Sequence, residues 1–452
     1  MTGIIASKPD NQINIAIVGS GALGQALASV YLDKERAIPG RNLEYKVTLL
    51  NFYPSPSRVL KEVQDGKYDF RELHAHSAYD HLAKGVYYDT GKREAGEGTL
   101  VIAAPEVTGS LDDSIQLALH EADVVPLAVT SDAVRPVLQK LVPYLKPGVP
   151  VVNYAKGWEM NDQGSKITIT DPYHIMREEL AGLGIPKFYH SGYMMYTNLL
   201  NGQLTLSMLW TGMGSDVKAG EKSRHEWLKY LSHVLSREDY GVIPAGSKGL
   251  RTVLLSGLIK PTIALSTGYL AGVEKNGRRI YESEGAKGAL INAYLDSLHH
   301  FIAKFGGNPK FIFDPKFQAI GDDIRYTAQG PDSANYKAGL KRAQGMPVEE
   351  IKNQSGRSIE GFNQLPILKA LIDIEPELDT MGLIPATHDI FFRDGMDVET
   401  LIRNLLHNQT AFSDGTMPPK KSFSSARSLI ENWNMDRFGK TDPITIEKKV
   451  RK

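Results

Sequence analysis

The sequence contains no cysteine. Disulfides, thiolate catalysis and cysteine-ligated zinc or iron–sulfur sites are therefore excluded, and any redox chemistry needs a bound cofactor. The 452 residues also carry no excess of charge, because 52 lysines and arginines balance 52 aspartates and glutamates. Balanced charge gives no general attraction to nucleic acid or to anionic lipid. We therefore expect a small-molecule partner and no nucleic acid.

Long apolar runs are missing as well, since no stretch approaches the ~18 continuous apolar residues of a membrane helix. The first twelve residues are polar and lack the basic and then apolar pattern of a secretory signal. We therefore expect no membrane span and a cytoplasmic location. Three histidines, His74, His76 and His81, lie close together without carboxylate support, and no metal site is expected.

Strand and helix patterns alternate through the first half of the chain. Short apolar or β-branched runs predict strands at residues 13–18, 45–50, 99–103, 123–129 and 149–154, with helical segments such as 133–145 between them. Further strand patterns at 166–170, 188–191 and 204–210 are compatible with antiparallel extensions of the same sheet. This alternation predicts an α/β fold with a doubly wound parallel sheet of the Rossmann type.

The pattern changes near Gly246, after which helical runs dominate, at 250–270, 288–305, 359–374 and 398–406. The sequence thus predicts two domains, residues 1–245 and 246–452, of which the second is mostly α-helical. Residues 53–98 fit no regular repeat and are interpreted as an insertion or lid. The end of the chain is interpreted as a helix-bearing extension with a basic tail.

A glycine-rich turn joins the first predicted strand to the first predicted helix. It reads Gly19-Ser20-Gly21-Ala22-Leu23-Gly24. In this context Gly19 permits a tight turn, Gly21 lets backbone amides approach a pyrophosphate, and Gly24 lets the helix lie on the strand. The helix N-terminus then holds the anion. The alternative is a packing turn that binds no ligand.

The residue at the end of the second predicted strand does not decide between NAD and NADP. An acidic residue at its end usually accepts the ribose hydroxyl bonds of NAD. Asn51 occupies that place here, and its amide has no charge to repel a 2′-phosphate. The sequence therefore predicts NAD or NADP as the cofactor.

Two lysines and a carboxylate are candidates for catalysis. Lys156 follows the strand at 149–154, where open α/β sheets bind their ligands, although a lone lysine there is more often a surface residue. Lys260 lies inside the apolar run 253–265, where a lysine either extends to water or has a function. Asp323 either begins a helix or pairs with such a lysine.

Most of the chain resembles the NAD(P)-dependent glycerol-3-phosphate dehydrogenase family. The resemblance rests on the glycine turn and on segments that recur in order: 122–131 with Thr130 in place of a proline, Tyr154-Ala155-Lys156-Gly157, Ser191-Gly192-Tyr193, Leu258-Ile259-Lys260 followed by Gly268 and Gly272, the Asp323-to-Thr327 spacing, Ser333-Ala334-Asn335 and Ile359-Glu360-Gly361.

The resemblance implies reversible hydride transfer between NAD(P)H and dihydroxyacetone phosphate, giving sn-glycerol 3-phosphate for glycerophospholipid synthesis. It implies that Lys260 donates the proton and stabilises the alkoxide, that Lys156 orients the substrate, that Asp323 holds Lys260 and that Thr327 hydrogen-bonds substrate or lysine. The implied cofactor contacts are Gly19 to Gly24, Asn51, Thr130, Lys156, Asn335 and Glu360, with no metal. A homodimer, with the active site in the cleft between the two domains, is also expected.

Two departures from the family pattern keep other functions open. Pro261 replaces the asparagine that follows the family's catalytic lysine, and Ala334 replaces an arginine that holds the substrate phosphate. Donors that are able to replace this arginine are Arg325, Lys337, Lys341 and Arg342. The alternatives are a related reductase acting on another 2-oxo or 2-hydroxy compound, and a dinucleotide-binding regulatory protein without activity.

Overall fold

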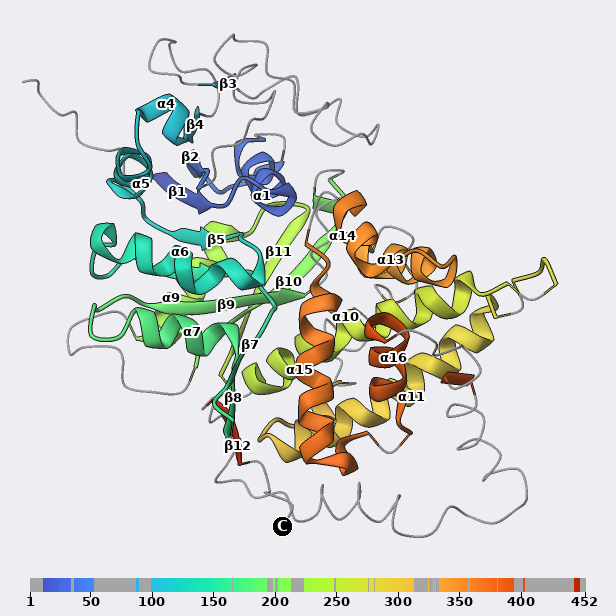
Figure 1. Cartoon of the computed structure of the whole chain (residues 1–452). Helices are drawn as coiled ribbons and strands as arrows, with labels where there is room; N and C mark the ends of the chain where they lie inside the picture. Colours follow the sequence, from blue (N-terminus) through green and yellow to red (C-terminus); the bar gives the residue numbers. More distant parts are fainter. Residues whose placement is uncertain are drawn as a thin grey trace, which may run out of the picture. The chain divides into compact units, whose positions relative to one another are not determined.

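A computed structural model describes residues 11–33, 36–52, 87–88, 99–164, 166–192, 198–199, 202–212, 223–247, 249–274, 276–279, 281–312, 324, 328, 330, 333–355, 358–379, 381–393, 401–402 and 443–447. The chain divides into two units, Met1–Ala155 with Ile175–Gly246, and Lys156–His174 with Ser247–Lys452 (Figure 1). The second unit thus takes in a short segment that lies, in sequence, between two parts of the first.

The first unit is built on a nine-stranded sheet with the order β11-β10-β9-β6-β5-β1-β2-β4-β3. Its strands are β1 Gln12–Val18, β2 Glu44–Leu50, β3 Tyr87–Tyr88, β4 Thr99–Ala103, β5 Val125–Leu127, β6 Val151–Asn153, β9 Lys187–Gly192, β10 Thr205–Trp210 and β11 Tyr240–Gly246. Neighbouring strands are parallel except for the antiparallel pair β9 and β10. The prediction of a doubly wound sheet is confirmed.

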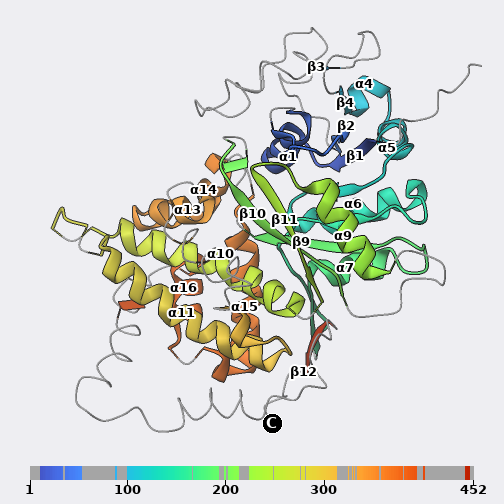
Figure 2. The same ribbon diagram turned by 180° about the vertical axis from the view of Figure 1, so that it is seen from behind.

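Helices cover both faces of this sheet. They are α1 Ala22–Leu32, α4 Pro105–Thr108, α5 Leu111–Leu119, α6 Val134–Leu141, α7 Pro172–Glu179 and α9 Arg224–Leu235, with 3-10 turns η3 Ser131–Ala133 and η4 Val142–Tyr144. Figures 1 and 2 show α6 and α9 on opposite faces. Alternate β1 residues Ile13, Ile15 and Ile17 join the apolar core with residues of α1 and α9, because side chains on a strand alternate between its two faces.

The second unit is mostly helical, as predicted. Its elements are α10 Leu250–Gly272, α11 Glu284–Lys304, η5 Pro309–Ile312, α13 Ala334–Ala343, α14 Val348–Ser355, α15 Glu360–Ile374, η7 Pro376–Leu378 and α16 Leu383–Phe392. Of the predicted helix at 398–406, only residues 401 and 402 are described, and both are helical.

The second unit also contains a small sheet that the sequence did not indicate. It consists of β7 Glu159–Asp162, β8 Lys166–Thr170 and β12 Ile444–Glu447, in the order β12-β8-β7, with antiparallel pairs. The idea that residues 166–170 extend the large sheet was therefore wrong, because their hydrogen-bonding partners come from β7 and from the end of the chain. The other two predicted extensions of the large sheet, 188–191 and 204–210, are confirmed as β9 and β10, which form its antiparallel pair. Residues 403–442 and 448–452 of the predicted C-terminal extension, and residues 53–98 apart from β3, lie outside the described residues.

The longest described helix, α10, forms the centre of the second unit. By length and composition it is able to cross a membrane, but 83% of its most apolar window is buried within the structure, as in the core helix of a soluble protein. It packs closely against α13, because a Cβ on Gly268 would lie 2.1 Å from the carbonyl oxygen of Tyr336. A Cβ on Gly339 would lie 2.2 Å from the carbonyl oxygen of Leu265. Glycine at both positions is what allows the two backbones to touch.

Candidate functional site

The predicted glycine turn lies at the carboxyl end of β1, where β1 stands beside β5 and β2 in the sheet order. Gly19 adopts a φ of 110°, and its amide donates to the carbonyl of Leu50 at 2.9 Å. A Cβ on Gly19 would lie 2.5 Å from the carbonyl oxygen of Ala128. A Cβ on Gly24 would lie 1.8 Å from the carbonyl oxygen of Gly19. Both positions therefore require glycine for backbone reasons alone.

Gly21 differs from its two neighbours in the motif. It is exposed, its φ is −71°, and a Cβ there would have no heavy atom within 4 Å. Gly21 is the N-cap of α1, and the first turn, Ala22 and Leu23 included, carries no acidic side chain. The amides at this helix start face no competing carboxylate on their own turn, so the turn suits an anionic group.

The other predicted cofactor contacts of the first unit lie at the ends of neighbouring strands. Asn51 follows β2 directly and is buried. Its backbone N–H donates to the carbonyl of Ala103 at 2.9 Å. Thr130 follows β5, is exposed, and caps the turn η3. Ser20, in the turn, accepts a bond from the side chain of Gln25 at 2.6 Å. The sheet thus brings Gly19, Asn51 and Thr130 to its carboxyl edge, where such sheets bind ligands.

A buried aromatic cluster stabilises the end of β6, just before Lys156. The ring of Tyr154 stacks on His190 with centroids 4.4 Å apart. His190 Nε2 lies 3.1 Å from Ser207 Oγ and 3.2 Å from the hydroxyl of Tyr240. Burial and the neighbouring tyrosines raise the pKa of Tyr154 well above its ordinary value. This phenol therefore stays protonated and does not act as a base near neutral pH.

The two candidate lysines both belong to the second unit. Lys260 is half-buried on α10, between the buried residues Ile259 and Pro261. Lys156 is half-buried in the connection between β6 and β7. A lysine side chain in an apolar helix keeps its charge only where water or polar groups reach it. The partial exposure of Lys260 meets that condition.

Two further predicted residues, Asn335 and Glu360, begin neighbouring helices. The Asn335 side-chain oxygen accepts from the amide of Gly361 at 2.8 Å, which ties the first turn of α13 to the first turn of α15. Glu360 is half-buried at the start of α15. A Cβ on Gly361 would lie 2.5 Å from a methyl group of Leu265 on α10. The starts of α13 and α15 therefore lie against the helix that carries Lys260. Asp323 and Thr327 lie outside the described residues.

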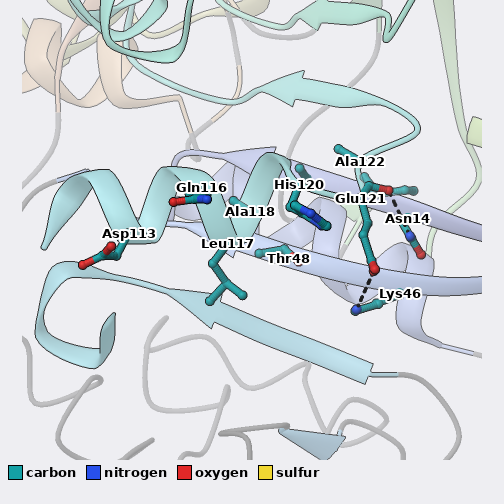
Figure 3. Close-up of a pocket in the computed structure, with 12 residues that line it drawn as sticks. Asn14, Lys46, Thr48, Asp113, Gln116, Leu117, Ala118, His120, Glu121 and Ala122 are labelled. Atoms are coloured by element: carbon teal, nitrogen blue, oxygen red, sulfur yellow. Dashed lines mark hydrogen bonds and ion pairs between the residues drawn. The ribbon is translucent and has the colours of Figure 1, made fainter. Parts of the chain in front are cut away.

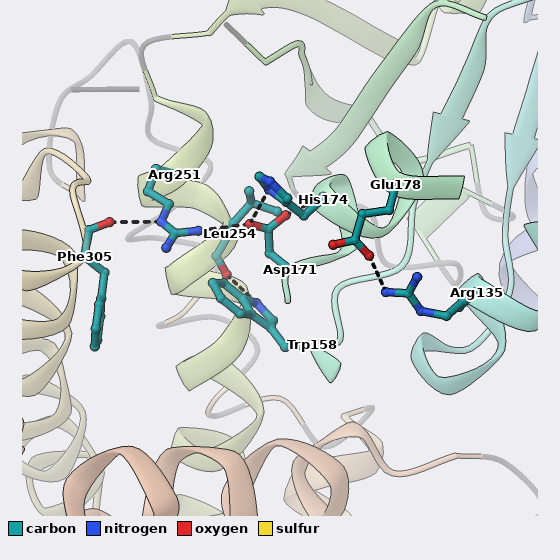
Figure 4. Close-up of polar contacts among 8 residues, drawn as sticks. All are labelled: Arg135, Trp158, Asp171, His174, Glu178, Arg251, Leu254 and Phe305. Carbon is teal, nitrogen blue, oxygen red and sulfur yellow. Dashed lines mark hydrogen bonds and ion pairs between the residues drawn. The ribbon is translucent and has the colours of Figure 1, made fainter. Parts of the chain in front are cut away.

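Sequence reasoning missed a group of buried residues that joins the Lys156 segment to α10 (Figure 4). Arg251 Nη1 donates to Asp171 Oδ2 at 3.0 Å, and Arg251 Nε donates to the carbonyl of Phe305 at 3.0 Å. The indole of Trp158 donates to the carbonyl of Leu254 at 3.1 Å. One signal was available, because Arg251, like Lys260, is a cation in an apolar helix. Its partner was not recognisable, since an aspartate before Pro172 has the pattern of an ordinary loop residue.

A cavity of about 430 Å³ lies elsewhere in the first unit, between β1, β2 and α5 (Figure 3). Two of the charged residues that line it form an ion pair, with Lys46 Nζ 3.2 Å from Glu121 Oε2. It is lined by the early part of β1 and β2, away from the strand ends that carry Gly19 and Asn51, and by none of the predicted site residues. We therefore do not place the candidate site there.

Comparison with known proteins gives a match within the second unit and further matches over most of the chain. Residues 250–403, which include Lys260, Asn335 and Glu360, match the sequence model described as NAD-dependent glycerol-3-phosphate dehydrogenase C-terminus. Glycerol-3-phosphate dehydrogenase [NAD(P)+] of Bacillus subtilis is 24% identical over 295 residues, which are 64% of this chain and 75% of the relative. The protein of the same name from Pediococcus pentosaceus is 22% identical over 400 residues, 87% of this chain and 96% of the relative.

Solved structures of glycerol-3-phosphate dehydrogenases share the fold of this chain. The crystal structure of glycerol-3-phosphate dehydrogenase from Coxiella burnetii aligns with a TM-score of 0.62 at 20% identity, covering 87% of this chain and 99% of that one. An enzyme structure of that name from Saccharomyces cerevisiae aligns with the same TM-score at 15% identity and the same coverage. The chain is thus similar in its C-terminal segment to the NAD-dependent glycerol-3-phosphate dehydrogenase model, similar over most of its length to NAD(P)-dependent glycerol-3-phosphate dehydrogenases, and shares the fold of these enzymes.

Proposed function

We propose that the chain is an NAD(P)-dependent oxidoreductase that transfers hydride reversibly between NAD(P)H and dihydroxyacetone phosphate, giving sn-glycerol 3-phosphate. The observation that carries the proposal is Lys260, a half-buried cation on the central apolar helix of the segment matched by the family's sequence model. A reduction of a carbonyl group needs a cation and a proton donor beside the oxygen, and a lysine supplies both.

The glycine turn fits the pyrophosphate of a nicotinamide dinucleotide. Exposed Gly21 leaves space beside the helix start, while Gly19 and Gly24 hold the turn against the sheet. The bound dinucleotide supplies the hydride for reduction and accepts it for oxidation. Asn51 carries no negative charge, so either NAD or NADP is accommodated.

Both lysines act on the substrate, and Lys156 is also proposed to contact the dinucleotide. Lys260 stabilises the negative charge that develops on the C2 oxygen of the substrate and gives that oxygen its proton. Lys156 orients the substrate and adds positive potential. We assign Asp323 to hold the Lys260 ammonium group by a charge-assisted hydrogen bond, and Thr327 to hydrogen-bond the substrate or the lysine. Asn335 and Glu360 are assigned to the dinucleotide, together with Thr130.

The substrate phosphate needs a donor, since Ala334 stands where the family has an arginine. Among the residues proposed to replace it, Arg342 donates to the carbonyls of Ile390 and Met346, and Lys341 donates to Gln354 at 2.9 Å. Both lie about 10 Å along α13 from Ala334, at 1.5 Å per residue. Lys337 is exposed and lies one turn from Ala334. Arg325 lies outside the described residues. Of the other three donors we assign the phosphate to Lys337.

The proposal predicts that the purified chain oxidises NADH or NADPH when dihydroxyacetone phosphate is added. The loss of reduced-nicotinamide absorbance measures the rate, and NMR identifies the product as glycerol 3-phosphate. Turnover only with unphosphorylated 2-oxo acids contradicts the proposal and indicates a related reductase. Tight binding of the dinucleotide without turnover on any oxo substrate indicates a regulatory protein.

A second prediction concerns the phosphate. Lys337→Ala is expected to raise the KM for dihydroxyacetone phosphate about 10-fold, as expected for one lost charge-assisted hydrogen bond, with little change in kcat. Lys341→Ala, which removes a lysine from the far end of the same helix, is the matched control and should leave the KM unchanged. Equal effects of the two substitutions would show that Lys337 does not bind the phosphate.

We further propose that the enzyme is a cytoplasmic homodimer and that its product enters glycerophospholipid synthesis. Two-fold dimers are the commonest assemblies of soluble enzymes, which supports the oligomeric state. Light scattering of the purified chain tests it, and a monomer at micromolar concentration would contradict it.

A further inference from the structure

Trp158 connects the segment Lys156–His174 to α10 and α15, two helices that carry other candidate residues. It lies two residues after Lys156 and is 5% exposed. Its indole Nε1 donates to the carbonyl of Leu254 on α10 at 3.1 Å, and its amide donates to Gln364 Oε1 on α15 at 3.3 Å. Lys260 lies on the first of these helices, and Glu360 lies one turn before Gln364 on the second.

The other end of the same segment is attached to the same turn of α10. Asp171, fully buried, follows β8 and accepts from Arg251 Nη1 at 3.0 Å. The Arg251 guanidinium lies 5.5 Å from the centre of the Trp158 ring, a cation–π distance. Asp171 also accepts from the amide of His174 at 2.8 Å. Figure 4 shows these side chains converging on the start of α10. Residues 156–174 are thus fixed at both ends.

The burial of these groups explains why the attachment is firm. A buried indole N–H is costly to leave without a partner, and Trp158 finds its partner on α10 rather than within its own loop. Removing one partner of a buried ion pair such as Arg251 with Asp171 strongly destabilises the protein, because the other charge is left buried without a partner. The backbone at Lys156 is therefore fixed relative to α10 by neighbours that are themselves buried.

We propose that Trp158 is a positioning residue that sets the place of the Lys156 ammonium group relative to Lys260, with Arg251 and Asp171 holding the far end of the segment. This inference rests on the proposed function, because it assigns Trp158 a role through Lys156. A displacement of about 1 Å in a group that orients the substrate can cost up to about 100-fold in rate. We therefore expect the loss of Trp158 to lower mainly kcat, because Lys156 is only one of several proposed contacts to the dinucleotide.

The test is Trp158→Phe, which keeps an aromatic ring and removes the N–H donor together with the five-membered ring of the indole. We expect kcat to fall about 10-fold while the dissociation constant of the reduced dinucleotide changes less than about twofold. Trp210→Phe is the matched control, because buried Trp210 likewise donates its indole N–H, to Ser191 at 2.8 Å, in the other unit. The control variant should retain the wild-type kcat.

A double-mutant cycle distinguishes positioning from general destabilisation. If Trp158 acts through Lys156, Trp158→Phe should have no further effect on kcat in a Lys156→Ala background. Losses that multiply in the double variant would overturn the proposal, as would an unchanged kcat in Trp158→Phe.

Amide hydrogen exchange gives a readout that does not depend on turnover. Trp158→Phe should speed exchange in residues 156–160, and Trp210→Phe should not. If the wild type fails to turn over dihydroxyacetone phosphate but exchange changes as expected, the proposed function fails while the attachment by Trp158 stands. Unchanged exchange in both variants overturns the attachment itself.

Discussion

Lys260→Met is expected to lower kcat by about three orders of magnitude. Methionine has a similar length and an apolar side chain, so it fits the surroundings of α10, of which Ile259 and Pro261 are buried. The substitution removes both the cation and the proton donor from the substrate oxygen, and losses of one such group usually cost about 100- to 10,000-fold. Steady-state and single-turnover rates measure the loss, and binding of the reduced dinucleotide should be unchanged.

The control for this experiment is another buried lysine of the same unit. Lys287 is 6% exposed on α11 and pairs with Glu284, so Lys287→Met also removes a buried cation. Its kcat should stay within about threefold of the wild type, because Lys287 is not among the residues proposed to contact substrate or cofactor. A Lys260→Met enzyme that keeps more than about a tenth of the wild-type kcat would show that the proton and the charge come from elsewhere.

Most strands of the large sheet were predictable because a short apolar run is a local feature, and an all-apolar run indicates a strand buried on both faces. The strands β3 and β11 were not predicted, and β11 is partly exposed and contains two glycines and a proline. The small sheet was not predictable in this way. The alternating residues of β8 indicate a strand, but they do not specify its partner, and β12 lies at the far end of the chain. Pairing over such a distance depends on tertiary structure, which the pattern of a single strand does not contain.

The candidate site likewise contains residues that a local sequence pattern predicts and residues whose role depends on distant partners. The glycine turn follows from the spacing of three residues between a strand and a helix, and Lys260 is conspicuous as a charge in an apolar run. Trp158 is different, because its role depends on reaching Leu254, 96 residues away. A tryptophan after Lys156-Gly157 has no pattern of its own. Residues that bind a ligand through local backbone geometry are therefore visible in the sequence, and residues that position others are not.

The glycine turn gives the second large effect, in two substitutions with opposite consequences. Gly24→Ala would place a methyl group 1.8 Å from the carbonyl oxygen of Gly19, so the backbone of the turn or of α1 must move. We expect a loss of about 3 kcal/mol in the free energy of unfolding. Gly21→Ala meets no heavy atom within 4 Å and has a φ of −71°, so stability should change by less than about 0.5 kcal/mol.

Measurements of dinucleotide binding should distinguish the role of the glycine turn in packing α1 from its role in binding the pyrophosphate. In Gly21→Ala the new methyl group occupies the space that the pyrophosphate needs, and affinity for the reduced dinucleotide should fall about 10- to 100-fold in a fully folded protein. Thermal unfolding without ligand and fluorescence titration with NADH and NADPH measure the two quantities. Gly288→Ala on α11, which also meets no heavy atom within 4 Å, is the control and should leave affinity unchanged. If Gly21→Ala binds the dinucleotide as tightly as the wild type, the turn serves only to pack α1 on the sheet, and hydride transfer loses its cofactor site.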